Sequence, residues 1–138
     1  MMTSVAGSPR HPPRLGLWTF DATADRLGWL RGEIRDSLSG THVDQGAVDL
    51  AVTEAVANVV RHAYRGGAGE VMIAIERAGD EVIVAVRDFG IGSDGFQAQI
   101  RETGGMGLPL IRAVADHVRL EPTTAGTLLL MRFSASDA

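Results

Sequence analysis

Residues 54–64 read EAVANVVRHAY, and they are the most informative stretch of the chain. Glu54, Asn58 and His62 follow one another at intervals of four, which on a helix places them in one polar stripe. Alanine and valine flank the stripe, so we expect it to face a cleft, with a solvated helix face as the alternative. A long helix is therefore predicted from about Asp44 to His62. A carboxylate one turn from an amide oxygen is a suitable pair for Mg²⁺ and its waters.

Two glycine-rich motifs follow this helix. Residues 88–92 read DFGIG after a strand-like run, and we expect Asp88 to accept a hydrogen bond from an adenine amino group while the glycines allow close approach. Residues 104–108 read GGMGL at the start of a helix, where exposed N–H groups and the helix dipole favour phosphate. A glycine-rich turn explains the first motif alone equally well, and a flexible hinge the second. Neither is a Walker A loop.

The remaining pattern predicts one α/β domain. Strands are expected at residues 15–20, 71–76, 81–87, 117–121 and 127–133, and helices around residues 27–38, 44–62 and 106–116. Asp21 and Thr23 are candidate caps for the first helix, and Thr41 to Asp44 loosely fits a capping box before the second. This order predicts a two-layer sandwich, with a mixed, mainly antiparallel sheet and helices on one face. Residues 1–14 are predicted to be a disordered arm and residues 15–135 a single domain.

Composition excludes several classes of function. The chain has 138 residues, 45% of them hydrophobic, and a net charge of -4, so we expect no nucleic-acid binding. It has no cysteine, which rules out disulfides, thiolate metal sites and cysteine nucleophiles. No run is long and apolar enough for a signal peptide or a membrane span, so a cytoplasmic protein that does not enter membranes is predicted.

The three motifs together resemble the N, G1 and G2 boxes of the GHKL (histidine-kinase-like, Bergerat-fold) ATPases. Within that superfamily, the tail His62-Ala63-Tyr64 and the stretch 105–111 are similar to the anti-sigma-factor serine kinases. The resemblance covers about residues 15–135. It implies ATP or ADP and Mg²⁺ as cofactors, a serine on an anti-anti-sigma (STAS-domain) protein as phosphoacceptor, a bound sigma factor, and a possible homodimer.

The resemblance also implies a role for each matching position. Asn58 would hold Mg²⁺, Glu54 would be the general base, and Asp88 would recognise adenine with support from the Thr127 hydroxyl. The nucleotide pocket would be shaped by Gly90, Gly92, Gly105, Met106, Gly107 and Leu108. His62 would either touch a phosphate or cap the helix end.

One departure from the family concerns the γ-phosphate. The family often carries an arginine near the second glycine box, whereas here the segment between the boxes is short and its nearest cation is Arg101. Arg101 is therefore the candidate replacement, or else a solvated side chain. This departure favours one alternative to a kinase of this type, a non-catalytic nucleotide-binding module, which the presence of Glu54 and Asn58 opposes. A detached histidine-kinase catalytic domain is a further alternative, against which the tail His62-Ala63-Tyr64 argues.

Overall fold

The structure, a computed structural model, describes residues 13–63, 69–90, 107–123 and 125–135. Its strands are β1 (Arg14–Asp21), β2 (Glu70–Ala78), β3 (Glu81–Asp88), β4 (His117–Thr123) and β5 (Gly126–Ser134). Its helices are α2 (Arg26–Ser37), α3 (Gln45–Asn58) and α5 (Gly107–Val114), and a π-helical turn, η1 (Val59–Ala63), continues α3. The predicted order of strands and helices is confirmed.

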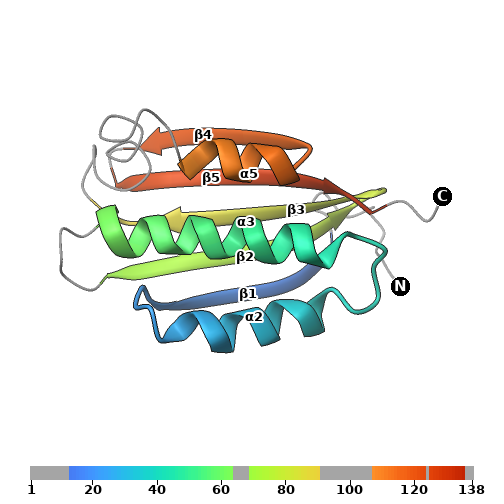
Figure 1. Cartoon of the computed structure of the whole chain (residues 1–138), viewed down its shortest axis with the longest axis horizontal. Helices are drawn as coiled ribbons and strands as arrows, with labels where there is room; N and C mark the ends of the chain where they lie inside the picture. The colour runs from blue at the N-terminus through green and yellow to red at the C-terminus, as the bar shows by residue number, and fades with distance from the viewer. Residues whose placement is uncertain (1–12, 64–68, 91–106, 124, 136–138) are drawn as a thin grey trace, which may run out of the picture.

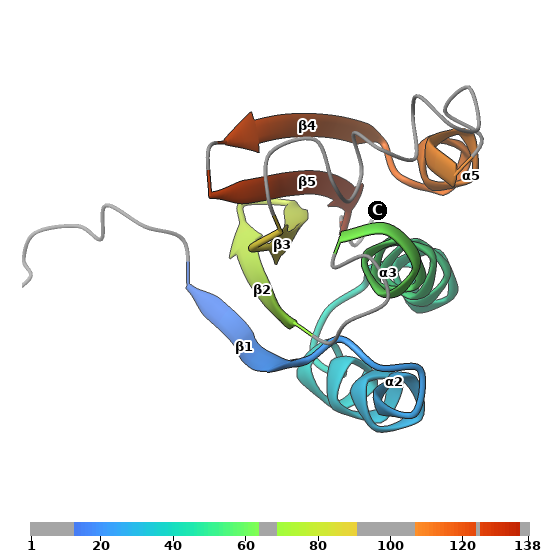
Figure 2. The same cartoon turned by 90° about the vertical axis from the view of Figure 1, so that its left-hand side faces the viewer.

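The five strands form one sheet in the order β1-β2-β3-β5-β4, and each of the four described pairings is antiparallel. Figures 1 and 2 show the helices on one face of this sheet, whereas the described residues leave the other face uncovered. The two-layer sandwich with a mainly antiparallel sheet is therefore confirmed. Of the predicted disordered arm, residues 1–12 lie outside the described residues, and Arg14 already belongs to β1.

The core lies between the sheet and the helices because alternate strand residues point toward the helices. Val82, Val84 and Val86 alternate on β3 with half-buried residues, and all three are fully buried. Their neighbours across the core come from the apolar sides of the helices. The largest fully buried side chains on the helices and at their ends are Leu30, Leu38, Val48, Val52, Val56, Val59 and Ile111.

The residues that cap the helices differ from the predicted ones. Asp25, and not Asp21 or Thr23, occupies the position before α2, without a side-chain cap hydrogen bond. A hydrogen bond with Thr23 lowers the pKa of the Asp25 carboxyl. Asp44 itself caps α3, since its Oδ1 accepts a hydrogen bond from the Ala47 N–H at 3.1 Å, and Thr41 instead donates to the Leu38 carbonyl. The predicted capping box is therefore wrong, because Asp44 is itself the N-cap and not the residue three positions after an N-cap at Thr41.

Candidate functional site

The polar stripe on α3 forms a cluster at the C-terminal end of that helix. Asn58 is fully buried, and its Oδ1 accepts a hydrogen bond from Arg61 Nη2 at 2.7 Å. The same Nη2 lies 3.3 Å from Oε2 of Glu54, one turn before Asn58. Within the described residues, Asn58 Nδ2 is buried without a hydrogen-bond partner. A buried amide donor in this condition is costly and suits a polar ligand.

Arg61 is a site residue that the sequence motifs did not identify. It follows Asn58 by three positions and Glu54 by seven, and both intervals return to the same side of a helix. The helical spacing that predicts the stripe therefore also indicates Arg61, at intervals of three and seven residues instead of four. The π-helical turn that carries Arg61 is a common feature of functional sites, but it has no evident signal in the sequence.

A second polar cluster lies where β3 ends and β5 begins. Asp88 and Thr127 are directly opposite each other in the β3–β5 pairing, and both are buried. Asp88 Oδ1 accepts a hydrogen bond from the Gly90 N–H at 3.0 Å, which fixes the carboxylate at the start of the predicted glycine loop. Thr127 Oγ1 is buried without a partner among the residues that the structure describes. This pair therefore offers a buried carboxylate and a hydroxyl side by side.

Gly126 makes the tight strand geometry at this cluster possible. Its φ of +131° is one that L side chains rarely adopt, and a Cβ there would overlap the Asp88 carbonyl oxygen and approach Phe89 Cα within 2.8 Å. The close approach of Gly126 to the end of β3 thus depends on the missing side chain. The sequence places this glycine at the end of the turn before β5, where Gly126-Thr127 belongs to the pattern shared with the GHKL ATPases.

Both clusters lie at the same end of the molecule. In Figures 1 and 2 the C-terminal end of α3, the end of β3, and the starts of β5 and α5 gather there. Leu108 is buried at the start of α5, where Gly107 opens the helix. The structure therefore brings Glu54, Asn58, Asp88, Gly90 and Thr127 to one end, as two clusters on the helix layer and the sheet.

Other predicted site residues lie outside what the structure describes. These are Gly92, Arg101, Gly105 and Met106. His62 belongs by its backbone to η1, but its side chain is outside the described part. Its two predicted roles, phosphate contact and helix cap, therefore remain open.

The donor set fits a magnesium ion held mainly by a bound phosphate. No group of three or more His, Cys, Asp or Glu side chains that could hold a metal occurs among the described residues. Magnesium does not need such a cage, since it keeps several waters and takes only one or two protein ligands beside substrate phosphates. Asn58 Oδ1 is a hard oxygen donor of this kind on a fully buried side chain, and the partly exposed Glu54 carboxylate lies one turn away. The unpartnered Asn58 Nδ2 is a donor, which suits a phosphate oxygen beside the metal.

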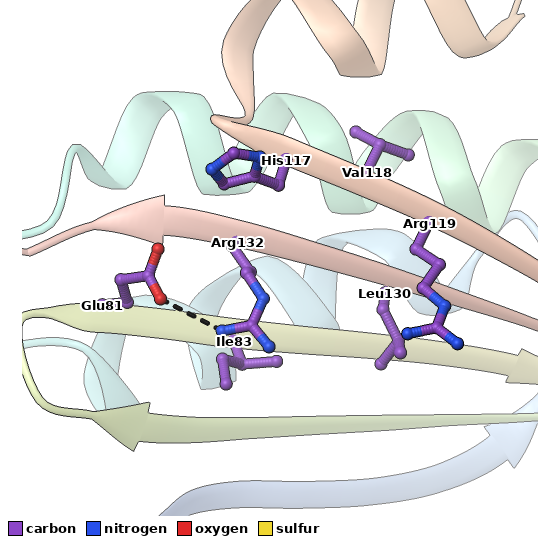
Figure 3. A pocket seen from close by; sticks show the side chains of 7 residues that line it. All are labelled: Glu81, Ile83, His117, Val118, Arg119, Leu130 and Arg132. Atoms are coloured by element: carbon purple, nitrogen blue, oxygen red, sulfur yellow. Dashed lines mark hydrogen bonds and ion pairs between the residues drawn. The ribbon is translucent and has the colours of Figure 1, made fainter.

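A cavity of about 450 Å³ lies away from this end, on the uncovered face of the sheet. Figure 3 shows that its wall comes from β3, β4 and β5, with the side chains of Ile83 and Leu130 in the middle. Arg132 and Glu81 form an ion pair at 3.0 Å on its rim, and His117 and Arg119 complete that rim. None of the predicted nucleotide-binding residues lines this cavity.

Comparisons with known proteins agree with the fold and the motif pattern. A family model described as a histidine kinase-like ATPase domain matches residues 20–133. The serine-protein kinase RsbW of Bacillus cereus (strain ZK / E33L) is 26% identical over 129 residues, which cover 83% of this chain and 73% of that protein. RsbW of Bacillus pumilus (strain SAFR-032) is 27% identical over 144 residues, covering 91% and 82%.

Solved structures show the same fold at lower identity. The RsbU and RsbW domains of a Mycobacterium tuberculosis protein align with a TM-score of 0.65 and 24% identity over 89% of this chain, which spans 33% of that longer chain. The Acinetobacter baumannii histidine kinase AdeS aligns with a TM-score of 0.55 and 15% identity, covering 90% of this chain and 70% of that one. In the described residues, every helix is too short or too polar to cross a membrane.

Proposed function

Because the chain belongs to the histidine kinase-like ATPase domain family, we propose that it is a serine/threonine-protein kinase of the anti-sigma-factor type. It binds Mg-ATP, transfers the γ-phosphoryl group to a serine on a STAS-domain antagonist protein, and sequesters a sigma factor. Its similarity to proteins named serine-protein kinase RsbW favours serine over histidine as the phosphoacceptor. A switch with these partners acts in the cytoplasm, and it needs neither nucleic acid nor a membrane.

One observation carries this proposal: two polar clusters, built around the buried Asn58 and around the buried Asp88 and Thr127, lie at the same end of the fold. The Asp88–Thr127 pair offers an acceptor and a hydroxyl, which suit the amino group and ring nitrogen on the edge of an adenine. The Glu54–Asn58 pair offers hard oxygens, which suit the metal and phosphate end of the same ligand. A nucleotide that lies between the two clusters would satisfy buried groups on both sides.

The chemistry asked of the protein is modest. Phosphoryl transfer depends mainly on positioning and on neutralising charge. Asn58 would hold magnesium, which when bound supplies that neutralisation, and Glu54 would accept the proton of the attacking hydroxyl. Asp88 and Thr127 would fix the base, and backbone N–H groups around Gly90, Gly92, Gly105 and Gly107 would line the pocket, together with Met106 and Leu108.

The cation that faces the γ-phosphate has two candidates. Arg101 was predicted from its place between the glycine boxes and remains a proposal. Arg61 is the second candidate, since its guanidinium donates hydrogen bonds to Glu54 and Asn58. We propose that Arg61 contributes positive charge at the metal and phosphate end, and that His62 on the same turn adds a phosphate contact.

The base-recognition role of Asp88 gives a direct test. In Asp88→Asn, the amide oxygen can keep the hydrogen bond from Gly90, whereas the NH₂ group would oppose the adenine amino group. Affinity for ATP should fall about 5- to 150-fold, since leaving such a buried pair mismatched costs about 1–3 kcal/mol. Isothermal titration calorimetry measures this. Asp36→Asn, an exposed change on α2, is the control, and equal affinities in both variants would remove Asp88 from this role.

The uncovered face of the sheet is the surface through which we propose that the chain forms a homodimer. Its middle is formed by half-buried apolar side chains, and its rim mixes arginine with glutamate, so a twofold axis can bring opposite charges together. The apolar residues are Met72, Ala74, Ile83, Ala85, Leu128 and Leu130. We place a second copy of this chain on this face, because the helices cover only the opposite face of the sheet.

Introducing a charge should therefore dissociate the dimer. Ala85 lies on β3 between Ala74 and Leu130 in the strand register, at the middle of the face. Ala85→Glu should convert a sedimenting dimer to a monomer in analytical ultracentrifugation, because two copies of the buried charge would have no partner. Leu50→Glu, on the exposed side of α3, should leave the dimer intact. A wild-type monomer at tens of micromolar would refute this interface.

A further inference from the structure

The Arg61 guanidinium contacts both Asn58, the proposed metal ligand, and Glu54, the proposed proton acceptor. Its Nη2 donates to Asn58 Oδ1 at 2.7 Å and lies 3.3 Å from Glu54 Oε2. The first distance is short for a hydrogen bond from a charged nitrogen to a neutral oxygen. The side chain therefore folds back along the helix and places its positive charge on the oxygens of the stripe.

The three side chains differ in their ability to move. Asn58 is fully buried, and three-quarters of the Glu54 side chain is covered, so neither can turn far. About half of the Arg61 side chain is exposed, and it is carried on a π-helical turn at the end of α3. Arg61 is thus the member of this cluster that can leave, and its departure into solvent costs only a partly screened interaction.

A divalent cation bound at Asn58 and the Arg61 guanidinium would both contact the Asn58 Oδ1 atom. The amide oxygen of Asn58 has two lone pairs, but a guanidinium on one and a metal ion on the other would place two positive charges side by side, and these repel each other. Metal binding at Asn58 is therefore opposed while Arg61 holds this contact, and it becomes favourable once the guanidinium moves away. Until then, Arg61 keeps the buried Asn58 oxygen satisfied and its side chain oriented.

We propose that Arg61 is a positioning residue that acts as an internal counter-cation for the metal site. In the nucleotide-free chain it holds Asn58 and Glu54 in place and excludes divalent cations from them. It releases them when a phosphate draws the guanidinium away, so metal binding becomes coupled to nucleotide binding. This proposal rests on the metal-ligand role of Asn58 in the proposed function.

The test uses Mn²⁺ alone with the nucleotide-free full chain. Paramagnetic broadening of the ¹⁵N-labelled Asn58 side-chain amide reports occupancy, and the resonance is identified by its loss in Asn58→Ala. Arg61→Gln should lower the Mn²⁺ concentration at half-broadening about 3- to 30-fold, because the competing charge-assisted contact is gone and its strength is reduced by exposure. Arg61→Lys should also lower this midpoint, since a shorter side chain with a single ammonium reaches both oxygens poorly. The fall should be smaller than in Arg61→Gln, because lysine keeps the positive charge.

Arg31→Gln is the matched control. It removes an arginine whose ion pair with Asp49 lies between α2 and α3, so it lowers the net charge equally without touching the cluster. Its midpoint should equal that of the wild type. The proposal is overturned if Arg61→Gln leaves the midpoint unchanged, or if Arg61→Lys keeps the wild-type midpoint while Arg61→Gln lowers it, because charge alone would then explain the effect.

Calorimetry of ADP binding separates this proposal from the proposed function. A wild-type chain that binds Mn²⁺ at Asn58 but no nucleotide would refute the kinase while the Arg61 comparison stands. Nucleotide binding with no broadening at Asn58 in any Arg61 variant would instead refute the counter-cation.

Discussion

Glu54→Gln is expected to slow phosphoryl transfer by about 10²–10⁴-fold while leaving nucleotide binding intact. Glutamine keeps the shape of the side chain and an oxygen that can face Arg61, but it cannot accept the proton of an attacking hydroxyl. Ground-state affinity should change little, because a carboxylate near a triphosphate is not an attractive contact. The effect therefore belongs to the chemical step and should appear in the single-turnover rate.

The measurement is single-turnover transfer from γ-labelled ATP to a candidate STAS-domain partner, with ATP affinity measured in parallel by calorimetry. Glu33→Gln is the matched control, since it makes the same change on α2, where Glu33 accepts a hydrogen bond from Trp18 that glutamine can keep. Equal transfer rates in the wild type and Glu54→Gln would show that Glu54 is not the base. If the wild type binds ATP and partners but transfers nothing, the non-catalytic nucleotide-binding module replaces the kinase.

Local patterns were sufficient to predict the strands and helices. The alternation of valine and isoleucine on residues 71–87 predicted two neighbouring strands, because a hairpin with one buried face demands that period. Helix caps were predicted less well, because several side chains near a helix start can accept the same backbone hydrogen bonds. Asp25 and Asp44 occupy the cap positions, which are decided by where the preceding chain leaves the core.

The candidate site was predicted in its parts but not in its contacts. The stripe on α3 follows from helical spacing alone, whereas the return of Arg61 onto Asn58 depends on a side-chain conformation. That Asp88 and Thr127 lie directly opposite each other depends on the register between β3 and β5, which are separated in the chain by α5 and β4. Nothing local to either strand determines that register, so only the resemblance linked the two residues.

Gly126→Ala is expected to destabilise the fold by about 3–5 kcal/mol and to weaken nucleotide binding with it. The φ of +131° costs about 1–3 kcal/mol for a residue with a Cβ, and the overlap with the Asp88 carbonyl would force β5 away from the end of β3. The melting temperature should fall by about 10–20 °C at this chain length. ATP affinity should also fall, because Asp88 and Thr127 would no longer lie side by side.

Two control variants, Gly79→Ala and Gly28→Ala, distinguish the cost of a positive φ from the cost of atomic overlap in the same melting experiment. Gly79 has a φ of +62° in the β2–β3 turn, and an added Cβ would meet no atom within 4 Å, so Gly79→Ala should cost only about 1 kcal/mol. Gly28 lies within α2 with equally open surroundings, so Gly28→Ala should raise stability by about 0.5–1 kcal/mol. If Gly126→Ala melts no lower than Gly79→Ala, the close packing of Gly126 against the Asp88 carbonyl contributes nothing to stability. A fall in melting temperature confined to Gly126→Ala, together with weaker ATP binding, would show that this close packing stabilises both the sheet and the Asp88–Thr127 pair.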